Sequence, residues 1–286
     1  MNRISDEASV RTDAAEKAEE SLRKKFRLSL FSKFTKGIKE YDLIQANDKI
    51  AVCMSGGKDS FLLAKLFQEL QLHNKVPFAL EFLVMDPGYS HANREAIENN
   101  AARLNIPVHI FETDIFGSVF RIEKSPCYIC ARMRRGHLYH QARDLGCNKI
   151  ALGHHYDDVI ETILMGMLYG GQVQTMMPKL KSANFEGMEL IRPMYLIREK
   201  DITAWRDYND LSFLQCACKF TENCASCETK ESASKRKKVK ELIAVLAGED
   251  PEIEQNIFKS VENVTLKTVI AYKDEAGVKH RFTDDY

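Results

Sequence analysis

Short apolar runs alternate with longer stretches of helical periodicity between residues 49 and 169. The apolar runs cover residues 50–54, 78–85, 108–111 and 150–153, and the helical stretches cover 61–72, 91–104, 131–145 and 157–169. Strands and helices that alternate at these lengths are typical of βαβ units, in which a helix connects two parallel strands. The pattern therefore predicts an α/β fold with a doubly wound parallel sheet over residues 46–212.

Helical segments are predicted on both sides of this sheet domain. Residues 1–45 are polar and charged, and their apolar side chains recur at helical spacing, at Leu22, Phe26, Leu30, Phe31 and Phe34. Residues 213–286 contain a cysteine-rich stretch, a basic helix predicted over 235–246 and a polar tail. We therefore expect an N-terminal helical arm (1–45), the α/β domain (46–212) and a C-terminal Cys-containing helical extension (213–286).

Net charge gives no indication of a polyanionic partner, because 41 Lys and Arg residues balance 41 Asp and Glu residues. Positive charge is instead concentrated in local clusters. These are Arg23, Lys24, Lys25 and Arg27; Arg132, Arg134 and Arg135; and Lys235, Arg236, Lys237, Lys238 and Lys240. Each cluster is compatible with a nucleic-acid contact or with a solvated helix face.

The chain has neither a signal-peptide core nor a run of about 18 apolar residues, the length that a membrane-spanning helix needs. We therefore expect a cytoplasmic protein that does not enter a membrane. In that compartment its eight cysteines are better explained as metal ligands, catalytic thiols or core residues than as disulfides.

The first predicted strand runs directly into Ser55-Gly56-Gly57-Lys58-Asp59-Ser60, and a predicted helix follows. Glycines let the backbone approach a ligand closely, and the N–H groups at a helix N-terminus attract anions. Lys58 adds a positive charge, and the hydroxyls of Ser55 and Ser60 add hydrogen bonds. The spacing differs from the Walker motif, so a kinase-type cradle is not indicated. A tight turn alone would leave Lys58, Asp59 and Ser60 unexplained, so the sequence predicts a phosphate-binding loop.

Acidic residues follow two other predicted strands. Asp86 ends the second strand, and Asp157 and Asp158 stand where the fourth strand gives way to a helix. Open parallel sheets bind ligands at the carboxyl ends of their strands. Paired carboxylates beside phosphates suit Mg²⁺, which prefers hard oxygen ligands, and they also suit the first turn of a helix as caps. We expect both roles, with Asp158 as the better magnesium ligand.

The run S-G-G-K-D-S resembles the signature of the PP-loop ATP pyrophosphatases, and Gly153-His154 with Asp157-Asp158 resembles their G-H-x-x-D-D element. The resemblance implies that ATP is bound by the phosphate loop together with Asp86, Gly153, His154 and Asp157, and that AMP is transferred to a substrate oxygen. It further implies catalytic roles for Lys58, Asp59, Arg134 and Asp158.

A CxxC motif, Cys127-Tyr128-Ile129-Cys130, precedes the basic helix that carries Arg134. Two such thiolates can ligate a metal or a cluster, or act as a redox pair. The position of the motif between the third and fourth strands resembles the tRNA 2-thiolation branch of the PP-loop family, and the match is nearest to its TtcA-like 2-thiocytidine group. In that branch the CxxC and one C-terminal cysteine hold a [4Fe-4S] cluster. We assign Cys216 by its position, with Cys218 as the rival.

The remaining cysteines allow other interpretations. A separate zinc site of Cys216, Cys218, Cys224 and Cys227 is the alternative to this cluster assignment, although Cys-x-Cys spacing is less typical of zinc. We interpret Cys53 and Cys147 as core or turn residues.

The resemblance also implies a substrate and a reaction. The C2 oxygen of an anticodon-loop cytidine in tRNA would attack the α-phosphate of ATP, and cluster-held sulfur would then displace AMP. Lys58 and Mg²⁺ would stabilise pyrophosphate charge, while Arg134 or Arg135 would stabilise the transition state or hold tRNA phosphate. Expected partners are tRNA and a sulfur donor such as a cysteine desulfurase, and a homodimer is compatible with the sequence.

Two other classes of function stay open. One is a PP-loop enzyme that adenylates another tRNA base, as in the TtuA-like 2-thiouridine group, or a small substrate without any cluster. The other is a non-catalytic iron-sulfur protein that binds RNA or senses redox state.

Overall fold

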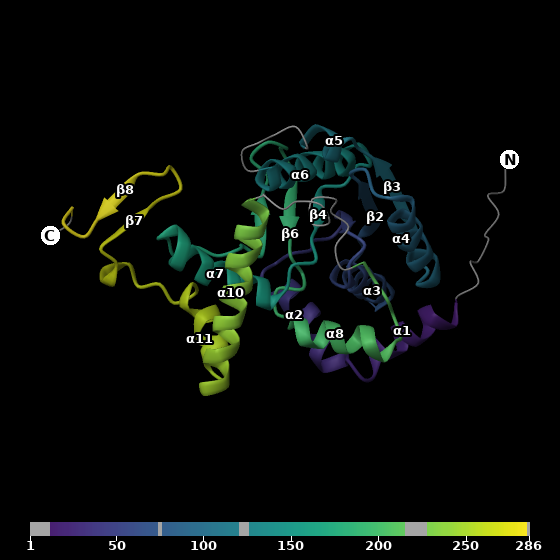
Figure 1. Cartoon of the computed structure of the whole chain (residues 1–286), viewed down its shortest axis with the longest axis horizontal. Helices are drawn as coiled ribbons and strands as arrows, with labels where there is room; N and C mark the ends of the chain where they lie inside the picture. Colours follow the sequence, from purple (N-terminus) through teal and green to yellow (C-terminus); the bar gives the residue numbers. More distant parts are fainter. Residues whose placement is uncertain (1–11, 74–75, 120–125, 215–227, 285–286) are drawn as a thin grey trace. The chain divides into compact units, whose positions relative to one another are not determined.

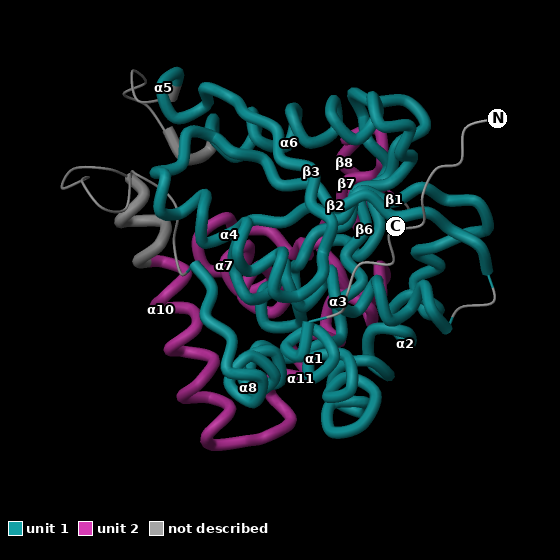
Figure 2. The backbone as a smooth tube through the Cα atoms, turned by 90° about the vertical axis from the view of Figure 1, so that its right-hand side faces the viewer, with its two compact units in different colours: residues 1–158, 177–234 teal, residues 159–176, 235–286 magenta. Residues whose placement is uncertain are grey.

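The computed structural model describes residues 12–73, 76–119, 126–214 and 228–284, without the side chains of residues 119, 126–128 and 228–234. The chain forms two compact units (Figure 2). Unit 1 comprises Met1–Asp158 and Met177–Ser234, and unit 2 comprises Val159–Met176 and Lys235–Tyr286. The boundaries placed in the sequence at residues 46 and 212 stay a prediction.

Unit 1 is built on a six-stranded sheet with the order β3-β2-β1-β4-β6-β5. The strands are β1 (Lys49–Met54), β2 (Ala79–Asp86), β3 (Val108–Glu112), β4 (Lys149–Ala151), β5 (Lys179–Lys181) and β6 (Glu189–Ile191). All neighbours pair in parallel except β5, which is antiparallel to β6. The predicted parallel sheet is confirmed. The sequence pattern does not predict β5 and β6. β5 has one apolar residue between two lysines and β6 has two after a glutamate, so neither forms an apolar run like residues 150–153 at β4.

Helices of unit 1 cover both faces of this sheet (Figure 1). They include α3 (Lys58–His73), α4 (His91–Arg103), α5 (Ile115–Val119), α6 (Pro126–Asp144) and α8 (Glu199–Tyr208). The helix α7 (Tyr156–Gly170) follows β4, and only its first three residues belong to unit 1. Successive residues of a strand face opposite sides of the sheet. Ile50 and Val52 of β1 pack in one core cluster with α3, and Ala51 and Cys53 pack in another with α6. The expected doubly wound arrangement therefore holds, with β1 buried on both faces.

The predicted N-terminal arm is helical, and its apolar side chains lie in the core of unit 1. It consists of α1 (Asp13–Arg23), a π-helical segment η1 (Arg27–Phe31) and α2 (Ser32–Glu40). Leu22, Leu30 and Phe34 are fully buried in the same cluster as the apolar face of α3. The spacing of three and four residues thus marks the face that the helices bury against the sheet domain.

Two cations of the first basic cluster contribute to this packing. Arg23 forms an ion pair with the buried Glu69 of α3 at 2.9 Å. The ammonium group of Lys25 lies 3.9 Å from the centroid of the Tyr208 ring in α8. These two side chains hold the N-terminal segment to α3 and α8.

Unit 2 contains the residues of α7 from Val159 onward and the C-terminal segments. The latter are α10 (Glu228–Glu249, from Lys235 in this unit), α11 (Ile253–Ser260), a short 3₁₀ turn η2 (Leu266–Thr268) and the antiparallel hairpin of β7 (Ala271–Lys273) and β8 (Lys279–Arg281). The predicted basic helix is confirmed as part of α10. The predicted polar tail contains the hairpin. No helix in the described part of the chain is long and apolar enough to span a membrane.

Candidate active site

The predicted phosphate loop connects β1 to α3 at the carboxyl edge of the sheet. The strand order reverses at β1, because β2 lies on one side of it and β4 on the other. Doubly wound sheets bind ligands at such a reversal. Gly56 has a φ of +87°, and a Cβ there would lie 2.9 Å from the Ile97 side chain. A Cβ on Gly153, after β4, would lie 3.3 Å from the backbone of Asp59. Both positions therefore require glycine, one for its conformation and one for close packing.

The loop is shaped by hydrogen bonds to its carbonyl groups. The Ser60 hydroxyl donates to the Gly57 carbonyl at 2.8 Å, and the Leu214 backbone N–H donates to the Gly56 carbonyl at 3.2 Å. The N–H groups in the first turn of α3 have no intrahelical acceptor, as at any helix start. The loop is therefore built to receive an anion at the N-terminus of α3.

Lys58 is held in this loop by two carboxylates. Its Nζ lies 3.0 Å from Oδ1 of Asp59 and 3.2 Å from Oε1 of Glu199 in α8. Burial disfavours the charged ammonium group, but the two carboxylates prevail and raise the pKa of Lys58. Glu199 is not identifiable from the sequence, because it stands 141 residues away from Lys58 and belongs to no motif.

Asp157 and Asp158 have different roles at the start of α7. Asp158 accepts a hydrogen bond from the His155 backbone N–H at 3.1 Å, and so caps its own helix. Asp157 accepts from the Glu199 backbone N–H at 2.7 Å and pairs with Arg198 at 3.2 Å, which joins α7 to α8. The expected capping roles are therefore present, although Asp157 caps α8 rather than α7.

A buried histidine brings two carboxylates of the site together. Nε2 of His155 lies 3.5 Å from Asp158 and 4.0 Å from Asp59, and the residue is only 6% exposed. Asp59 belongs to the phosphate loop and Asp158 to α7, so the histidine joins the two segments. In the sequence, His155 occupies a variable position of the G-H-x-x-D-D element, so no role is predicted for it.

A cavity of about 420 Å³ opens at the phosphate loop, a size that suits a small ligand. Three segments and the sheet edge line it: Ser55, Asp59 and Ser60; Gly153, His154 and Asp158; Ala131, Arg134 and Leu138 of α6; and Cys53, Met54, Met85 and Leu152. A second hollow of about 650 Å³ shares Ser55 and Asp59 with it and is also lined by Gly57 and Lys58. The loop therefore borders both spaces, and Lys58 faces the second.

Arg134 belongs to α6, the helix that contains the CxxC motif, and lines the first cavity. It lies one helical turn after Cys130 and lines the same space as Ser55 and Ser60. No carboxylate forms an ion pair with Arg134 among the residues that the structure describes. Its neighbour Arg135 lines a different cavity. Of the two arginines considered in the sequence, Arg134 is the one beside the phosphate loop.

Comparison with known proteins agrees with this geometry. A family profile described as a PP-loop domain matches residues 27–219. The tRNA-cytidine(32) 2-sulfurtransferase of Anaeromyxobacter dehalogenans (strain 2CP-C) is 34% identical over 79% of this chain and 76% of its own length. The protein of that name from Acaryochloris marina is 34% identical over 85% of this chain and 83% of its own length. This chain belongs to the PP-loop family.

A solved structure supports the same fold. The U34-tRNA thiolase NcsA from Methanococcus maripaludis, solved with its [4Fe-4S] cluster, superposes with a TM-score of 0.63 at 23% identity. The match covers 81% of this chain and 76% of that one. The α/β fold class predicted from the sequence is confirmed, and so is the predicted resemblance to the PP-loop family and its TtcA-like branch.

The CxxC motif of this PP-loop protein stands at the N-terminus of α6, between β3 and β4 as predicted. Cys130 is 7% exposed and packs with Met85, Ile115 and Phe116. Met85 of this cluster and Ala131, the residue after Cys130, both line the phosphate-loop cavity, so Cys130 lies near that cavity.

The other proposed cluster ligands lie outside the described parts. The backbone of Cys127 is in α6, but its side chain is not described. Cys216, its rival Cys218, and the zinc candidates Cys224 and Cys227 all fall in residues 215–227. The assignment of Cys216 stays a prediction.

Cys53 and Cys147 are core residues, as predicted. Both belong to the hydrophobic core cluster that contains the buried side chains of α6. Burial raises the pKa of Cys53 to about 12 and that of Cys147 to about 11. Because a metal is bound by the thiolate form, these two protonated thiols are poor ligands.

Asp86 is engaged in the turn that follows β2. Its carboxylate accepts hydrogen bonds from the backbone N–H groups of Gly88 and Tyr89, at 2.9 and 2.7 Å, and pairs with Arg94 at 3.0 Å. Burial opposes ionisation, but these donors hold the pKa of Asp86 below its ordinary value. Met85 lines the phosphate-loop cavity, whereas Asp86 is not among its lining residues. The predicted contact between Asp86 and ATP therefore stays a prediction.

The carboxylates that line the cavity can bind Mg²⁺ only together with phosphate oxygens, which supply further ligands. Among the residues that the structure describes, no three His, Cys, Asp or Glu side chains are grouped to hold a metal by themselves. Mg²⁺ commonly binds through one or two carboxylates plus substrate phosphates. Asp59 and Asp158 supply two carboxylates beside the phosphate loop, which meets that requirement.

Proposed function

We propose that this protein is an ATP-dependent tRNA sulfurtransferase that adenylates C2 of an anticodon-loop cytidine and replaces its oxygen with sulfur. The relatives that are 34% identical over 79% and 85% of the chain are named as 2-sulfurtransferases of tRNA cytidine 32. The observation that carries the proposal is the shared cavity: the phosphate loop and the CxxC helix line one space, which brings nucleotide activation and cysteine chemistry together.

The adenylation step uses the phosphate loop and two cations. Backbone N–H groups of the loop and the hydroxyls of Ser55 and Ser60 bind ATP phosphates, with Gly56 and Gly57 allowing their close approach. The cytidine oxygen attacks the α-phosphorus and pyrophosphate leaves. Lys58 stabilises the charge that accumulates on pyrophosphate, and Arg134, which lines the same cavity as Ser55 and Ser60, stabilises the α-phosphoryl group.

The remaining ATP contacts come from the segment after β4. Gly153 and His154 line the cavity, and Asp157 positions Glu199, which in turn holds Lys58. Asp59 and Asp158 would hold Mg²⁺ against the phosphates. When bound, the ion would neutralise phosphate charge during the displacement.

Cys127, Cys130 and Cys216 are the proposed ligands of a [4Fe-4S] cluster, as is expected for the TtcA-like branch. Cys130 is buried beside Met85 at the edge of the cavity, and Leu214, the last described residue before Cys216, is bonded to the phosphate loop. The cluster would supply the sulfur that displaces AMP. A donor such as a cysteine desulfurase would replenish it in the cytoplasm. We further propose that the protein acts as a homodimer.

Anaerobic turnover with tRNA tests this function. The reconstituted protein, ATP, Mg²⁺, sulfide and a tRNA transcript are incubated, pyrophosphate is measured, and the tRNA nucleosides are analysed by mass spectrometry. We expect 2-thiocytidine that depends on both ATP and the cluster. Formation of 2-thiouridine instead would move the protein to the TtuA-like group, and pyrophosphate release without any thionucleoside would indicate a cluster-independent ligase.

A further inference from the structure

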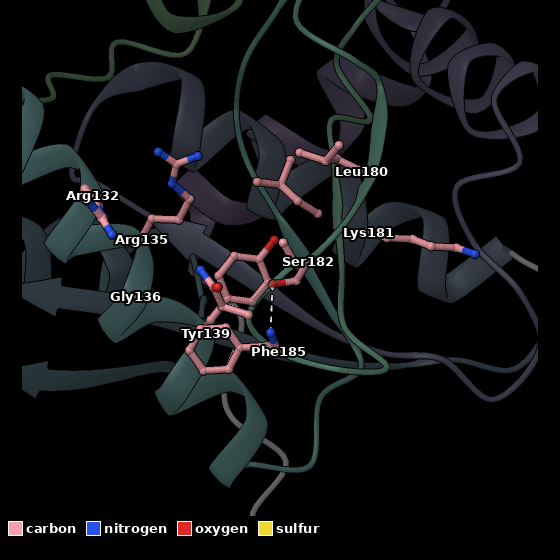
Figure 3. Close-up of a pocket in the computed structure, with 11 residues that line it drawn as sticks. Arg132, Arg135, Gly136, Tyr139, Leu180, Lys181, Ser182 and Phe185 are labelled. Carbon is pink, nitrogen blue, oxygen red and sulfur yellow. Dashed lines mark hydrogen bonds between the residues drawn. The ribbon is translucent and has the colours of Figure 1, made fainter. Parts of the chain in front are cut away.

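A third cavity lies beside α6 and shares no lining residue with the two at the phosphate loop. It has a volume of about 480 Å³, and the α6 residues Arg132, Arg135, Gly136 and Tyr139 form one wall. The opposite wall consists of residues 180–185, in β5 and the loop that follows it, and of Leu190 in β6. We call this space the arginine cavity (Figure 3). The proposed reaction does not use it, although Arg132 and Arg135 belong to the second basic cluster of the sequence.

Helix geometry explains why α6 serves two cavities. Ala131, Arg134 and Leu138 recur at helical spacing and face the phosphate-loop cavity. Arg132, Arg135 and Tyr139 have the same spacing, one residue later, and face the arginine cavity. Adjacent residues differ by about 100° around a helix and by about 1.5 Å along it. The two cavities therefore lie on adjacent sides of α6.

The arginine cavity is electropositive. No Asp or Glu is among the residues that line it. Arg132 and Arg135 are exposed, and neither forms an ion pair within the described ranges. Arg135 is close enough to Arg192 for their charges to repel, and burial lowers the pKa of Arg192 to about 10. Guanidinium groups without a carboxylate partner in such a recess favour a phosphate, which accepts two N–H bonds from one arginine.

Two aromatic side chains, Tyr139 and Phe185, line the cavity, and we call this pair the aromatic floor. The rings of Tyr139 and Phe185 are stacked, with centroids 5.1 Å apart and an angle of 12° between their planes. The Ser182 hydroxyl accepts a hydrogen bond from the Phe185 backbone N–H at 3.2 Å, which fixes the loop opposite the arginines (Figure 3). Ser182 and Asn184 add groups that can bond to a ribose or a base edge. Tyr139 is buried and Arg143 lies 5.4 Å from the Phe185 ring centroid, so the rings form an apolar wall beside the arginines. Positive charge beside aromatic side chains is the combination that binds single-stranded nucleic acid.

We propose that the arginine cavity binds a nucleotide of the substrate RNA strand next to the target base, with its phosphate on Arg132 and Arg135 and its base or ribose against the aromatic floor. The inference rests on the proposed function, since it assumes an RNA substrate whose target base enters the phosphate-loop cavity. The strand then crosses α6, and Arg134 and Arg135 act on different nucleotides. An isolated small anion would need neither the aromatic floor nor the neighbouring cavity.

The test compares two variants that remove the same charge. Arg135 lines the arginine cavity, whereas the exposed Lys39 of α2 lines none of the three cavities described above and belongs to none of the basic clusters. We expect Arg135→Ala to raise the KM for tRNA about tenfold or more, the double variant Arg132→Ala/Arg135→Ala to raise it further, and Lys39→Ala to change it less than about threefold. ATP affinity and kcat at saturating tRNA stay near the wild-type values. The salt slope of RNA binding falls by about 0.7 for each single-strand phosphate that the variant no longer neutralises.

A neutral phosphate in the RNA makes the test specific. Anticodon stem-loops that carry one methylphosphonate at successive positions beside the target cytidine are bound to wild type and to Arg135→Ala. At one position the neutral linkage should weaken wild-type binding about tenfold and leave the variant unaffected, because both changes remove the same interaction. Additive effects at every position would overturn the proposal, as would equal effects of Arg135→Ala and Lys39→Ala. A wild-type protein that thiolates no RNA would overturn the proposed function itself.

Discussion

At the residue scale, Lys58 carries the clearest consequence for ATP binding. Replacing Lys58 with Ala removes a charged donor to phosphate, which is worth about 1.5–3 kcal/mol, or roughly one to two decades in Kd. We expect this reduction in titrations with ATP and no change in the absorbance of a reconstituted cluster. Unaltered ATP affinity would show that Lys58, which faces the hollow of about 650 Å³, does not reach the phosphates.

Glu199 provides a second prediction at this scale. It holds the Lys58 ammonium at 3.2 Å and shares it with Asp59. Glu199→Gln keeps the shape of the side chain and removes its charge, so we expect a smaller reduction of ATP affinity than for Lys58→Ala. In the double variant the Glu199 change should add little, because its effect is exerted through Lys58. Fully additive effects would mean that Glu199 contacts the ligand independently.

At the element scale, α6 joins the cysteine motif to both cavities. If Cys130 is a cluster ligand, Cys130→Ser should lower iron content and the visible absorbance of the anaerobically reconstituted protein, while Cys147→Ser should leave both unchanged. Cys147 is a suitable control, because it is also buried and its thiol pKa is raised to about 11. The pair Cys216→Ala and Cys218→Ala then identifies the third ligand. Full occupancy in Cys216→Ala combined with an empty site in Cys218→Ala would reverse our assignment.

The basic helix α10 is the other element for which the sequence suggests RNA contact. Two of its cations have contacts inside unit 2: Arg236 pairs with Glu161 at 3.3 Å, and the Lys235 amine lies 5.7 Å from the Tyr169 ring centroid. Replacing Lys235, Arg236, Lys237 and Lys238 with Ala should weaken tRNA binding and flatten its salt dependence without affecting ATP affinity. Binding that is insensitive to this change at every salt concentration would make α10 a solvated face.

At the scale of the whole molecule, a buried ion pair ties the start of β1 to β4. Asp48 accepts from the Asn148 amide at 2.7 Å and pairs with Lys149 at 2.8 Å, and all but a few per cent of both Asp48 and Lys149 is buried. Burial disfavours the Asp48 carboxylate, but these bonds and the Gln45 backbone N–H hold its pKa below the ordinary value. Its ionised form therefore stabilises the fold above the unfolded-state pKa of about 3.9, and this contribution disappears as pH falls through the lower folded-state pKa.

Asp48→Asn tests this pH dependence. Removing one partner of a buried pair costs about 3–5 kcal/mol, and the second Lys149 partner, Glu189 at 3.2 Å, should reduce that cost. We expect the variant to be less stable than wild type in urea at about pH 7 and the difference to shrink below about pH 4. A difference that stays constant down to about pH 3 would contradict the assignment of this charge to stability.

Features that depend on local pattern could be predicted from the sequence. The apolar runs and helical periods indicate β1 to β4 and the helices after them, because strand and helix periodicities are legible within a few residues. The phosphate loop and the CxxC motif are likewise contiguous, so Ser55 to Ser60 and the position of Cys130 follow without coordinates. β5 and β6 lack an apolar run of the kind that marks β4, and the arm of residues 1–45 is not recognisable as part of the core.

Which distant side chains meet depends on the three-dimensional fold. The fold brings Glu199 to Lys58, joins Asp157 to α8, places His155 between two carboxylates and turns Asp86 toward its own loop. It also separates Arg134 from Arg135, which stand side by side in the sequence but line different cavities. The physical reason is that contacts across a sheet edge are set by strand order and helix rotation, and no local spacing of residues records either.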